Sequence, residues 1–167
     1  LLYVDIIDAC HLKCPTCVRG VRAFPNTAVK MPLDMFEKII LKAKKDGAYR
    51  VDIFSWIEPF LCQNLEDYTR IIKKHGLPCG ISTTLALRNI RSFVPVLRDI
   101  DLLTISISGF DQETNSVNHI GANIEWVKKN LNKLSQLLRS GETKVNATLR
   151  MLLFDYNVHH EHLLRQY

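Results

Sequence analysis

Short apolar runs rich in β-branched residues alternate along the chain with longer stretches in which apolar residues recur every three or four positions. The first pattern is typical of buried strands, and the second is typical of helices that bury one face. The short runs predict five strands, at residues 1–8, 50–55, 79–83, 102–108 and 145–154. The stretches between and after them predict helices that begin near residues 32, 64, 90, 111, 124 and 158.

Strands that alternate with helices, and that are too apolar to leave one face in water, indicate a parallel sheet covered by helices. We therefore expect an α/β fold, a partial (βα)6-type TIM barrel that is truncated after about five strands. The 167 residues have the length of one domain. The chain starts at a leucine and stops within a predicted helix, so we expect a single domain, residues 1–167, that is incomplete at its carboxyl-terminal end.

The composition is 47% apolar and 23% charged, as in ordinary soluble globular proteins. The net charge is +5, and the lysines are spread over predicted helices instead of being gathered with aromatic residues. Such a pattern is typical of solvated helix faces and gives no support to nucleic-acid binding. No apolar run is long enough to cross a bilayer and no secretory leader is present, so we expect a cytoplasmic protein without a membrane partner.

Three cysteines, Cys10, Cys14 and Cys17, stand close together directly after the first predicted strand. Iron–sulfur cubanes are normally held by four thiolates, so three cysteines leave one iron open to a ligand that is not protein. Zinc held by these thiolates and His11 is an alternative, but His11 adjoins Cys10 and no second pair of close ligands is visible. The odd count of five cysteines argues against disulfides. We therefore interpret the three cysteines as ligands of a 4Fe-4S cluster.

The spacing Cys-x3-Cys-x2-Cys resembles the signature of the radical S-adenosylmethionine (SAM) superfamily, and the likeness covers nearly the whole chain. In that family SAM chelates the open iron through its amino and carboxylate groups. An electron passed through the cluster then cleaves SAM to methionine and a 5′-deoxyadenosyl radical, which abstracts hydrogen from a substrate. The resemblance therefore implies an oxidoreductase of the radical SAM class with two cofactors, the 4Fe-4S cluster and SAM, and an electron donor of the flavodoxin or ferredoxin type.

Chemistry in βα barrels lies at the carboxyl ends of the strands. After the second strand, the run Trp-Ile-Glu-Pro at 56–59 resembles the Gly-Glu-Pro motif of the family, whose glutamate accepts a hydrogen bond from the SAM amino group. Here Ile57 replaces the glycine, and Glu58 taken alone could be a loop carboxylate before a turn-forming proline. The third strand ends in hydroxyl residues at 82–84, where relatives have Thr-Asn-Gly. These hydroxyls could line the SAM pocket or cap a local turn.

The fourth strand places Thr104, Ser106 and Ser108 on one face and isoleucines on the other. A polar face on a central strand is costly unless it lines a cavity or meets hydrogen-bond partners. The run resembles the family segment whose serine contacts the carboxylate or ribose of SAM, so the resemblance makes Ser106 and Ser108 candidate cofactor-binding residues.

The fifth strand contains Arg150, and an arginine buried there needs an anionic partner. Relatives hold the SAM carboxylate with an arginine in this strand and carry an asparagine near the adenosine just beyond it. The resemblance therefore makes Arg150 and Asn157 candidate cofactor-binding residues. An ion pair of Arg150 with Asp52 or Glu58 is the alternative.

The sequence contains other side chains of types that can bind metal, and we expect these to have structural places instead. His159, His160 and His162 stand with a glutamate at the opening of a helix, where we expect a solvated face. Cys62 and Cys79 are expected to be ordinary buried cysteines, although a substrate-side role for Cys62 stays open.

Residues 17–36 and 119–125 are similar to superfamily members that carry a carboxyl-terminal SPASM-type domain with auxiliary clusters. Those members act on ribosomal peptides, sugars or other proteins, so the resemblance leaves the substrate open, with peptides and sugars as candidate classes. The departures at Ile57 and at 82–84 keep one alternative function: an iron–sulfur protein with a regulatory or binding role and no SAM cleavage.

Overall fold

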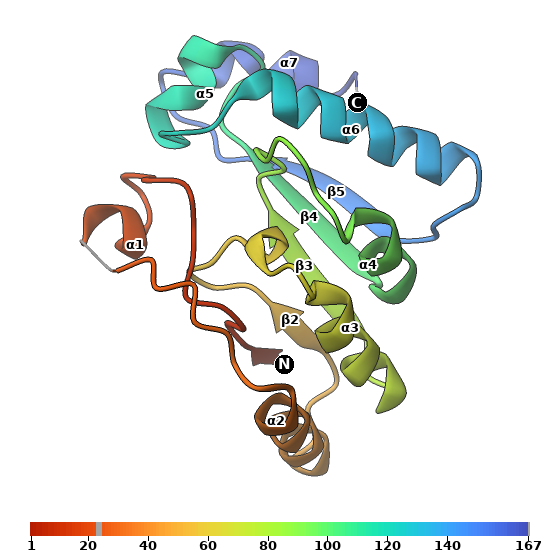
Figure 1. The fold of residues 1–167 in the computed structure, drawn as a ribbon. Coiled ribbons are helices and arrows are strands. Elements are labelled where there is room, and N and C mark those ends of the chain that lie inside the picture. Colours follow the sequence, from red (N-terminus) through yellow and green to blue (C-terminus); the bar gives the residue numbers. More distant parts are fainter. Residues whose placement is uncertain (23–24, 167) are drawn as a thin grey trace.

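The computed structural model describes residues 1–22 and 25–166. At its centre is a five-stranded parallel sheet whose strands follow one another in sequence order (Figure 1). The strands are β1 (Leu2–Tyr3), β2 (Val51–Ile53), β3 (Cys79–Thr83), β4 (Leu102–Ile107) and β5 (Asn146–Met151). The expected α/β class is confirmed, and the sheet is open, as in part of a βα barrel.

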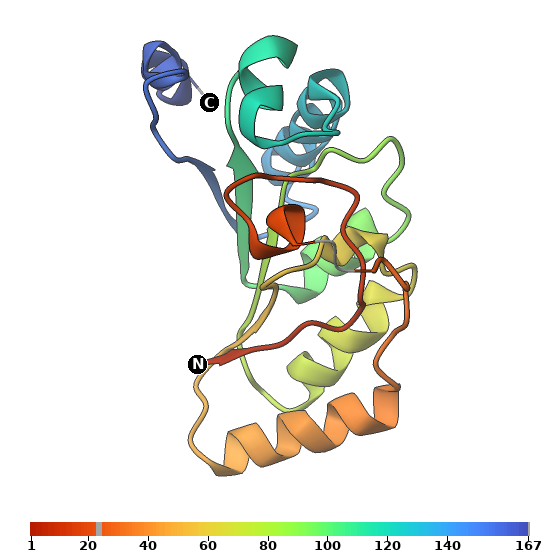
Figure 2. The same cartoon turned by 90° about the vertical axis from the view of Figure 1, so that its left-hand side faces the viewer.

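Helices connect the strands and cover one side of the sheet. They are α1 (Val18–Val21), α2 (Leu33–Lys45), α3 (Leu65–Lys74), α4 (Phe93–Asp99), α5 (Gln112–Asn118), α6 (Ile124–Arg139) and α7 (Glu161–Leu164), with 3-10 turns η1 (Pro59–Leu61) and η2 (Val158–His160). Helices α2, α3, α4 and α6 flank one face of the sheet, and none of these four covers the other face (Figures 1 and 2). Of the described helices, none is both long enough and apolar enough to span a bilayer.

The two faces of β4 differ as the sequence predicts. Leu103, Ile105 and Ile107 are buried, whereas Thr104 and Ser106, which alternate with them, are only partly buried. The strand register pairs Thr104 with Thr148 and Ser106 with Arg150 on β5. The uncovered face of the sheet is therefore polar toward the carboxyl ends of these two strands.

The first strand is shorter than predicted, and the chain beyond it pairs with a returning segment. The Met31 N–H donates to the Ile6 carbonyl, and the Asp8 N–H donates to the Val29 carbonyl, both at 2.9 Å. These antiparallel bonds occupy the edge that residues 6–8 would otherwise offer to solvent. The regular strand ends at Tyr3.

The predicted helix ends are confirmed at three glycines. Gly47, Gly76 and Gly141 have φ values of +86°, +68° and +73° just after α2, α3 and α6. Pro95 lies inside the first turn of α4, where backbone N–H groups have no helical partner and a proline costs little.

Candidate metal centre

The three cysteines lie on the segment 9–17, here the metal loop, which follows β1 and leads into α1. All three are free thiols of intermediate burial. The Cys17 N–H donates to the Cys14 carbonyl at 3.0 Å, and the carbonyl of Cys17 accepts from the first turn of α1. A tight turn therefore separates Cys14 from Cys17, and α1 directly follows it.

Gly20 allows α1 to fold back onto this turn. A Cβ atom at Gly20 would lie 2.0 Å from the carbonyl oxygen of Cys14 and 2.7 Å from its backbone nitrogen. No side chain fits at that distance, so glycine is required for the observed approach of α1 to the cysteine turn.

A polar cluster closes the base of the metal loop. The Arg19 guanidinium, whose side chain is 10% exposed, pairs with Asp8 and donates to Asn26 Oδ1 at 2.9 Å. The same oxygen accepts the Cys10 N–H at 3.0 Å, and the Thr27 hydroxyl donates to Asp8 at 2.8 Å. The hydrogen bond from Arg19 is the main cause of a lowered pKa for Asp8. The segments that enter and leave the loop are thus fixed to each other.

The thiols lie near enough to influence one another. Burial raises the pKa of Cys10, and burial followed by the charges of Cys10 and Cys17 raises the pKa of Cys14 to about 12. Three thiolates would repel each other here, and a cationic metal centre would offset that repulsion.

The donor atoms of the metal loop are three cysteine sulfurs. Among the residues that the structure describes, no three His, Cys, Asp or Glu side chains gather around one ion. In an iron–sulfur cubane each thiolate binds a different iron, so the sulfurs are spread more widely than the ligands of one ion. Three cysteine thiols on one loop are the type of donor that iron–sulfur clusters use.

Glu58 lies at the end of β2, beside the metal loop, and is 3% exposed. Its carboxylate accepts hydrogen bonds from the Thr83 hydroxyl at 2.7 Å and from the Thr84 N–H at 3.1 Å. The Glu58 N–H donates to the Ala9 carbonyl at 3.0 Å, next to Cys10. Thr83, the last residue of β3, and Thr84 thus hold this carboxylate.

Arg150 and Ser106 meet on the uncovered face of the sheet. The guanidinium Nη2 donates to the Ser106 hydroxyl at 3.0 Å. The expectation of a buried arginine is wrong, since Arg150 is exposed on β5, the last strand of the described sheet. Its alternative partners are engaged elsewhere: Asp52 pairs with Arg50, and Glu58 with the threonines.

Ser108 and Asn157 are buried and contact each other. The Asn157 amide donates to the Ser108 carbonyl at 3.0 Å, and its oxygen accepts the Phe154 N–H at 2.7 Å. The Ser108 N–H donates to Asn115 Oδ1, and its hydroxyl accepts from Asn118. The polar groups of both residues are therefore used inside the protein.

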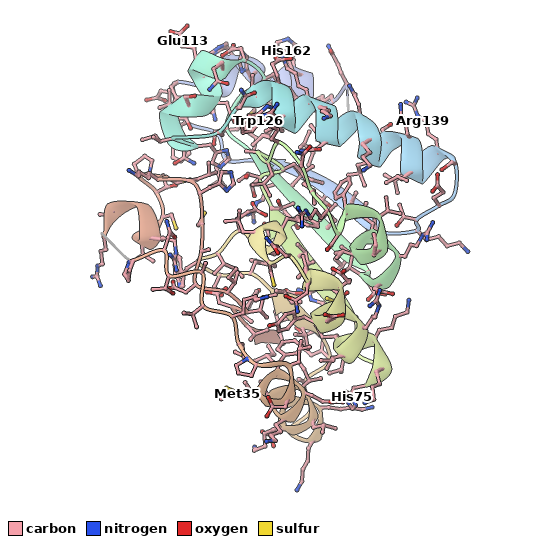
Figure 3. The ribbon with its side chains drawn as sticks, viewed as in Figure 1. Met35, His75, Glu113, Trp126, Arg139 and His162 are labelled. Atoms are coloured by element: carbon pink, nitrogen blue, oxygen red, sulfur yellow. The ribbon has the colours of Figure 1, made fainter. Side chains whose placement is uncertain are left out.

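One histidine differs from its predicted environment. His160 is buried: its Nδ1 accepts the Phe110 N–H at 3.2 Å, and its Nε2 lies 3.2 Å from Asp111. The prediction of a solvated face is therefore wrong for His160, whereas His159 and His162 are exposed, and His162 projects outward in Figure 3. Cys62 and Cys79 are buried as expected.

Sequence reasoning missed several residues that position the cysteines. Arg19 and Asn26 close the loop, and Thr16 bonds to Asn118. The nearness of Arg19 to Cys17 in the sequence was the available signal. Asn118 on α5 gave none, because its partner Thr16 is 102 residues away in the sequence.

Comparison with known proteins connects this geometry to a family. The family model described as the Radical SAM superfamily matches residues 4–166. The chain belongs to the radical SAM superfamily. That match spans the metal loop and all the strands from β2 to β5.

One curated relative and several solved structures are similar to this radical SAM chain. A Pyrococcus furiosus protein, named tungsten-containing aldehyde ferredoxin oxidoreductase cofactor-modifying protein, is 27% identical over 134 residues, which cover 77% of this chain and 37% of that protein. The structure titled native anSMEcpe with bound AdoMet has a TM-score of 0.71 at 15% identity, covering 99% of this chain and 47% of its own. The structure of Streptococcus suis SuiB bound to precursor peptide SuiA has a TM-score of 0.69 at 20% identity. The match covers 90% of this chain and 32% of the SuiB chain. At these identities the structural likeness shows the fold alone.

The chain spans about a third to a half of the length of these relatives.

Proposed function

We propose that this chain is the core of a radical SAM enzyme that binds a 4Fe-4S cluster through Cys10, Cys14 and Cys17. The observation that supports this most is the set of three free cysteines on the metal loop, beside a parallel sheet in a chain that the family model matches over residues 4–166. When bound, the cluster and SAM supply reductive cleavage of SAM and a 5′-deoxyadenosyl radical for hydrogen abstraction.

Arg150 and Ser106 are the proposed contacts to the SAM carboxylate. Arg150 is exposed on the uncovered face, and within the described residues no carboxylate lies at ion-pair distance from it. A guanidinium presents several N–H groups in one plane, so the bond to Ser106 leaves others to bind a carboxylate.

Glu58 is the proposed contact to the SAM amino group. A carboxylate has about four acceptor sites. Four donors already bond to Glu58, namely the Phe60 N–H, the Thr83 hydroxyl, and the N–H and hydroxyl of Thr84. An ammonium would therefore displace one of these donors or share an oxygen with it. Ser108 and Asn157 are assigned to the wall behind the cofactor, because their polar groups bond within the protein.

The substrate proposed for first testing is a peptide, with sugars second. Three of the similar structures contain a bound peptide: SuiB with the precursor peptide SuiA, and anSMEcpe with the Cp18Cys peptide and with the Kp18Cys peptide. The proposed electron donor is a flavodoxin or ferredoxin.

The test begins with anaerobic reconstitution of the protein and of Cys14→Ala. We expect the parent to gain the visible absorption of a cluster and the variant to lose most of it. Equal absorption in both would refute the ligand assignment. Dithionite reduction with SAM should then yield 5′-deoxyadenosine, whereas a loaded cluster without this product would favour an iron–sulfur protein with a regulatory or binding role.

A further inference from the structure

A short segment that begins with the last residue of α5, residues 118–121, contacts the metal loop at three points. The Thr16 hydroxyl donates to Asn118 Oδ1 at 2.7 Å, and the Lys13 N–H donates to the Ile120 carbonyl at 3.0 Å. Gly121, with φ of +95°, lies against the His11 carbonyl, which would be 3.3 Å from a Cβ at that position. The metal loop is therefore supported along most of its length by a segment about 100 residues later in the chain.

Asn118 is the side chain that joins this support to the sheet. It is buried, and its two ends bond in opposite directions. The Oδ1 atom accepts from Thr16, which lies between Cys14 and Cys17, and the Nδ2 group donates to the Ser108 hydroxyl at 3.2 Å. One amide thus links the cysteine turn to the residue that follows β4.

Helix α5 itself is held firmly against the end of β4. Asp111 caps it by accepting the Thr114 N–H at 2.7 Å. A Cβ at Gly109 would lie 2.6 Å from the Thr114 side chain and 2.8 Å from the Asn115 nitrogen, so the helix packs directly on the glycine backbone. The Ser108 N–H donates to Asn115 Oδ1 at 3.0 Å. Asn118 therefore projects from a fixed support.

The same strand end carries the proposed SAM contacts. Ser106 lies two residues before Ser108 on β4, and its hydroxyl accepts from Arg150. The hydrogen bonds from Thr16 to Asn118 and from Asn118 to Ser108 therefore link the cysteine turn to the strand end that carries the Ser106–Arg150 pair.

We propose that Asn118, acting through Thr16, is a positioning residue that sets where the open iron lies relative to the Ser106–Arg150 pair. This inference rests on the proposed function, because it needs a cluster on the cysteines. Asn118 touches neither metal nor cofactor in this role. It fixes the Cys14–Cys17 turn so that a ligand held at the strand end can reach the iron.

The test compares Thr16→Val with Thr16→Ser in the intact, anaerobically reconstituted protein. Valine keeps the shape of threonine but removes the hydroxyl donor, whereas serine keeps the donor. The first readout, made without SAM, is the rate at which a ferrous chelator removes iron. We expect Thr16→Val to release iron about fivefold faster than the parent, the factor that corresponds to one part-buried hydrogen bond of about 1 kcal/mol, and Thr16→Ser to match the parent.

The second readout is the electron paramagnetic resonance spectrum of the reduced cluster during titration with SAM. A merely structural role would leave this titration unchanged once iron content is equalised. We expect the SAM concentration that produces half of the spectral change to rise about fivefold in Thr16→Val and to equal that of the parent in Thr16→Ser. The control is Glu113→Gln, which changes an exposed side chain on α5, the helix that carries Asn118 (Figure 3). This variant should behave as the parent.

A double-mutant cycle with Asn118→Leu keeps the inference testable if one variant folds poorly. Because both single changes remove the same bond, Thr16→Val in the Asn118→Leu background should add less than its effect alone. Full additivity, or a Thr16→Val protein that matches the parent in both readouts, would overturn the inference. A parent that holds its cluster but does not bind SAM would count against the proposed function only. The iron-release readout would still test whether the Thr16–Asn118 bond holds the cysteine turn. A parent that binds no iron would overturn both.

Discussion

Arg150 donates from Nη2 to the Ser106 hydroxyl at 3.0 Å, across positions that face each other in the register of β5 and β4. The bond orients a cation on the uncovered face of the sheet. A charged donor held in this way is suited to a carboxylate ligand.

Replacing Arg150 with Met should weaken SAM binding by about 10- to 100-fold, the loss expected for hydrogen bonds to a charged group. Calorimetric titration of SAM into the reconstituted protein measures it. Thr148→Val is the matched control, because Thr148 lies two residues earlier on the same face of β5. An unchanged SAM affinity in the Arg150 variant would contradict the assignment.

Replacing Gly20 with Ala should abolish most iron binding, since the added carbon would meet the Cys14 carbonyl at 2.0 Å. The control is Gly47→Ala. Gly47 has open space around it but a positive φ, so alanine there should cost about 1 kcal/mol of stability and leave iron content unchanged. Iron analysis of both variants decides the matter, and normal loading of Gly20→Ala would show that α1 can move away from the cysteine turn.

His119 should make the protein less stable in acid. Burial, and then the charge of His11, lowers the pKa of His119 from 6.5 to about 4. The unfolded chain therefore binds this proton more readily, so stability is complete above about pH 6.5 and falls as the pH approaches 4. The free energy of unfolding, measured with urea, should differ less between pH 7 and pH 5 in His119→Gln than in the parent.

The matched control for that experiment is His162→Gln, because His162 is exposed on α7. It should keep the pH dependence of the parent. If both variants lose the same amount of stability between pH 7 and pH 5, another group causes the acid effect.

Replacing Glu58 with Gln should lower the free energy of unfolding by about 1–3 kcal/mol, because an amide NH2 would face the donors of Thr83 or Thr84. Chemical denaturation measures this change. Glu125→Gln, on the exposed start of α6, should change stability by less than about 0.5 kcal/mol. A Glu58 variant as stable as the parent would mean that the threonine donors find other partners.

Much of the fold follows from local sequence pattern. The β3 bounds, the polar face of β4 and the glycines that end α2, α3 and α6 depend on residues close in the chain. Local pattern also places the three cysteines on a loop after the first strand.

The features that were missed depend on contacts between distant residues. Thr16 and Asn118 are 102 residues apart, and Phe110 and His160 are 50 apart, so no periodicity could pair them. The sequence places Arg150 on a polar strand face that would line the cavity of a barrel and so predicts burial, but its place on the last strand of the described sheet exposes it. Burial at an edge depends on neighbouring strands, and a strand's own residues do not reveal its neighbours.

The central claim is that the three cysteines hold a cluster that cleaves SAM. The most direct measurement is the yield of 5′-deoxyadenosine, by liquid chromatography and mass spectrometry, after anaerobic reconstitution and dithionite reduction with SAM. We expect at least about one equivalent of 5′-deoxyadenosine per cluster over time, and none from Cys14→Ala treated alike. A parent protein with full iron and sulfide content that leaves SAM intact would contradict it.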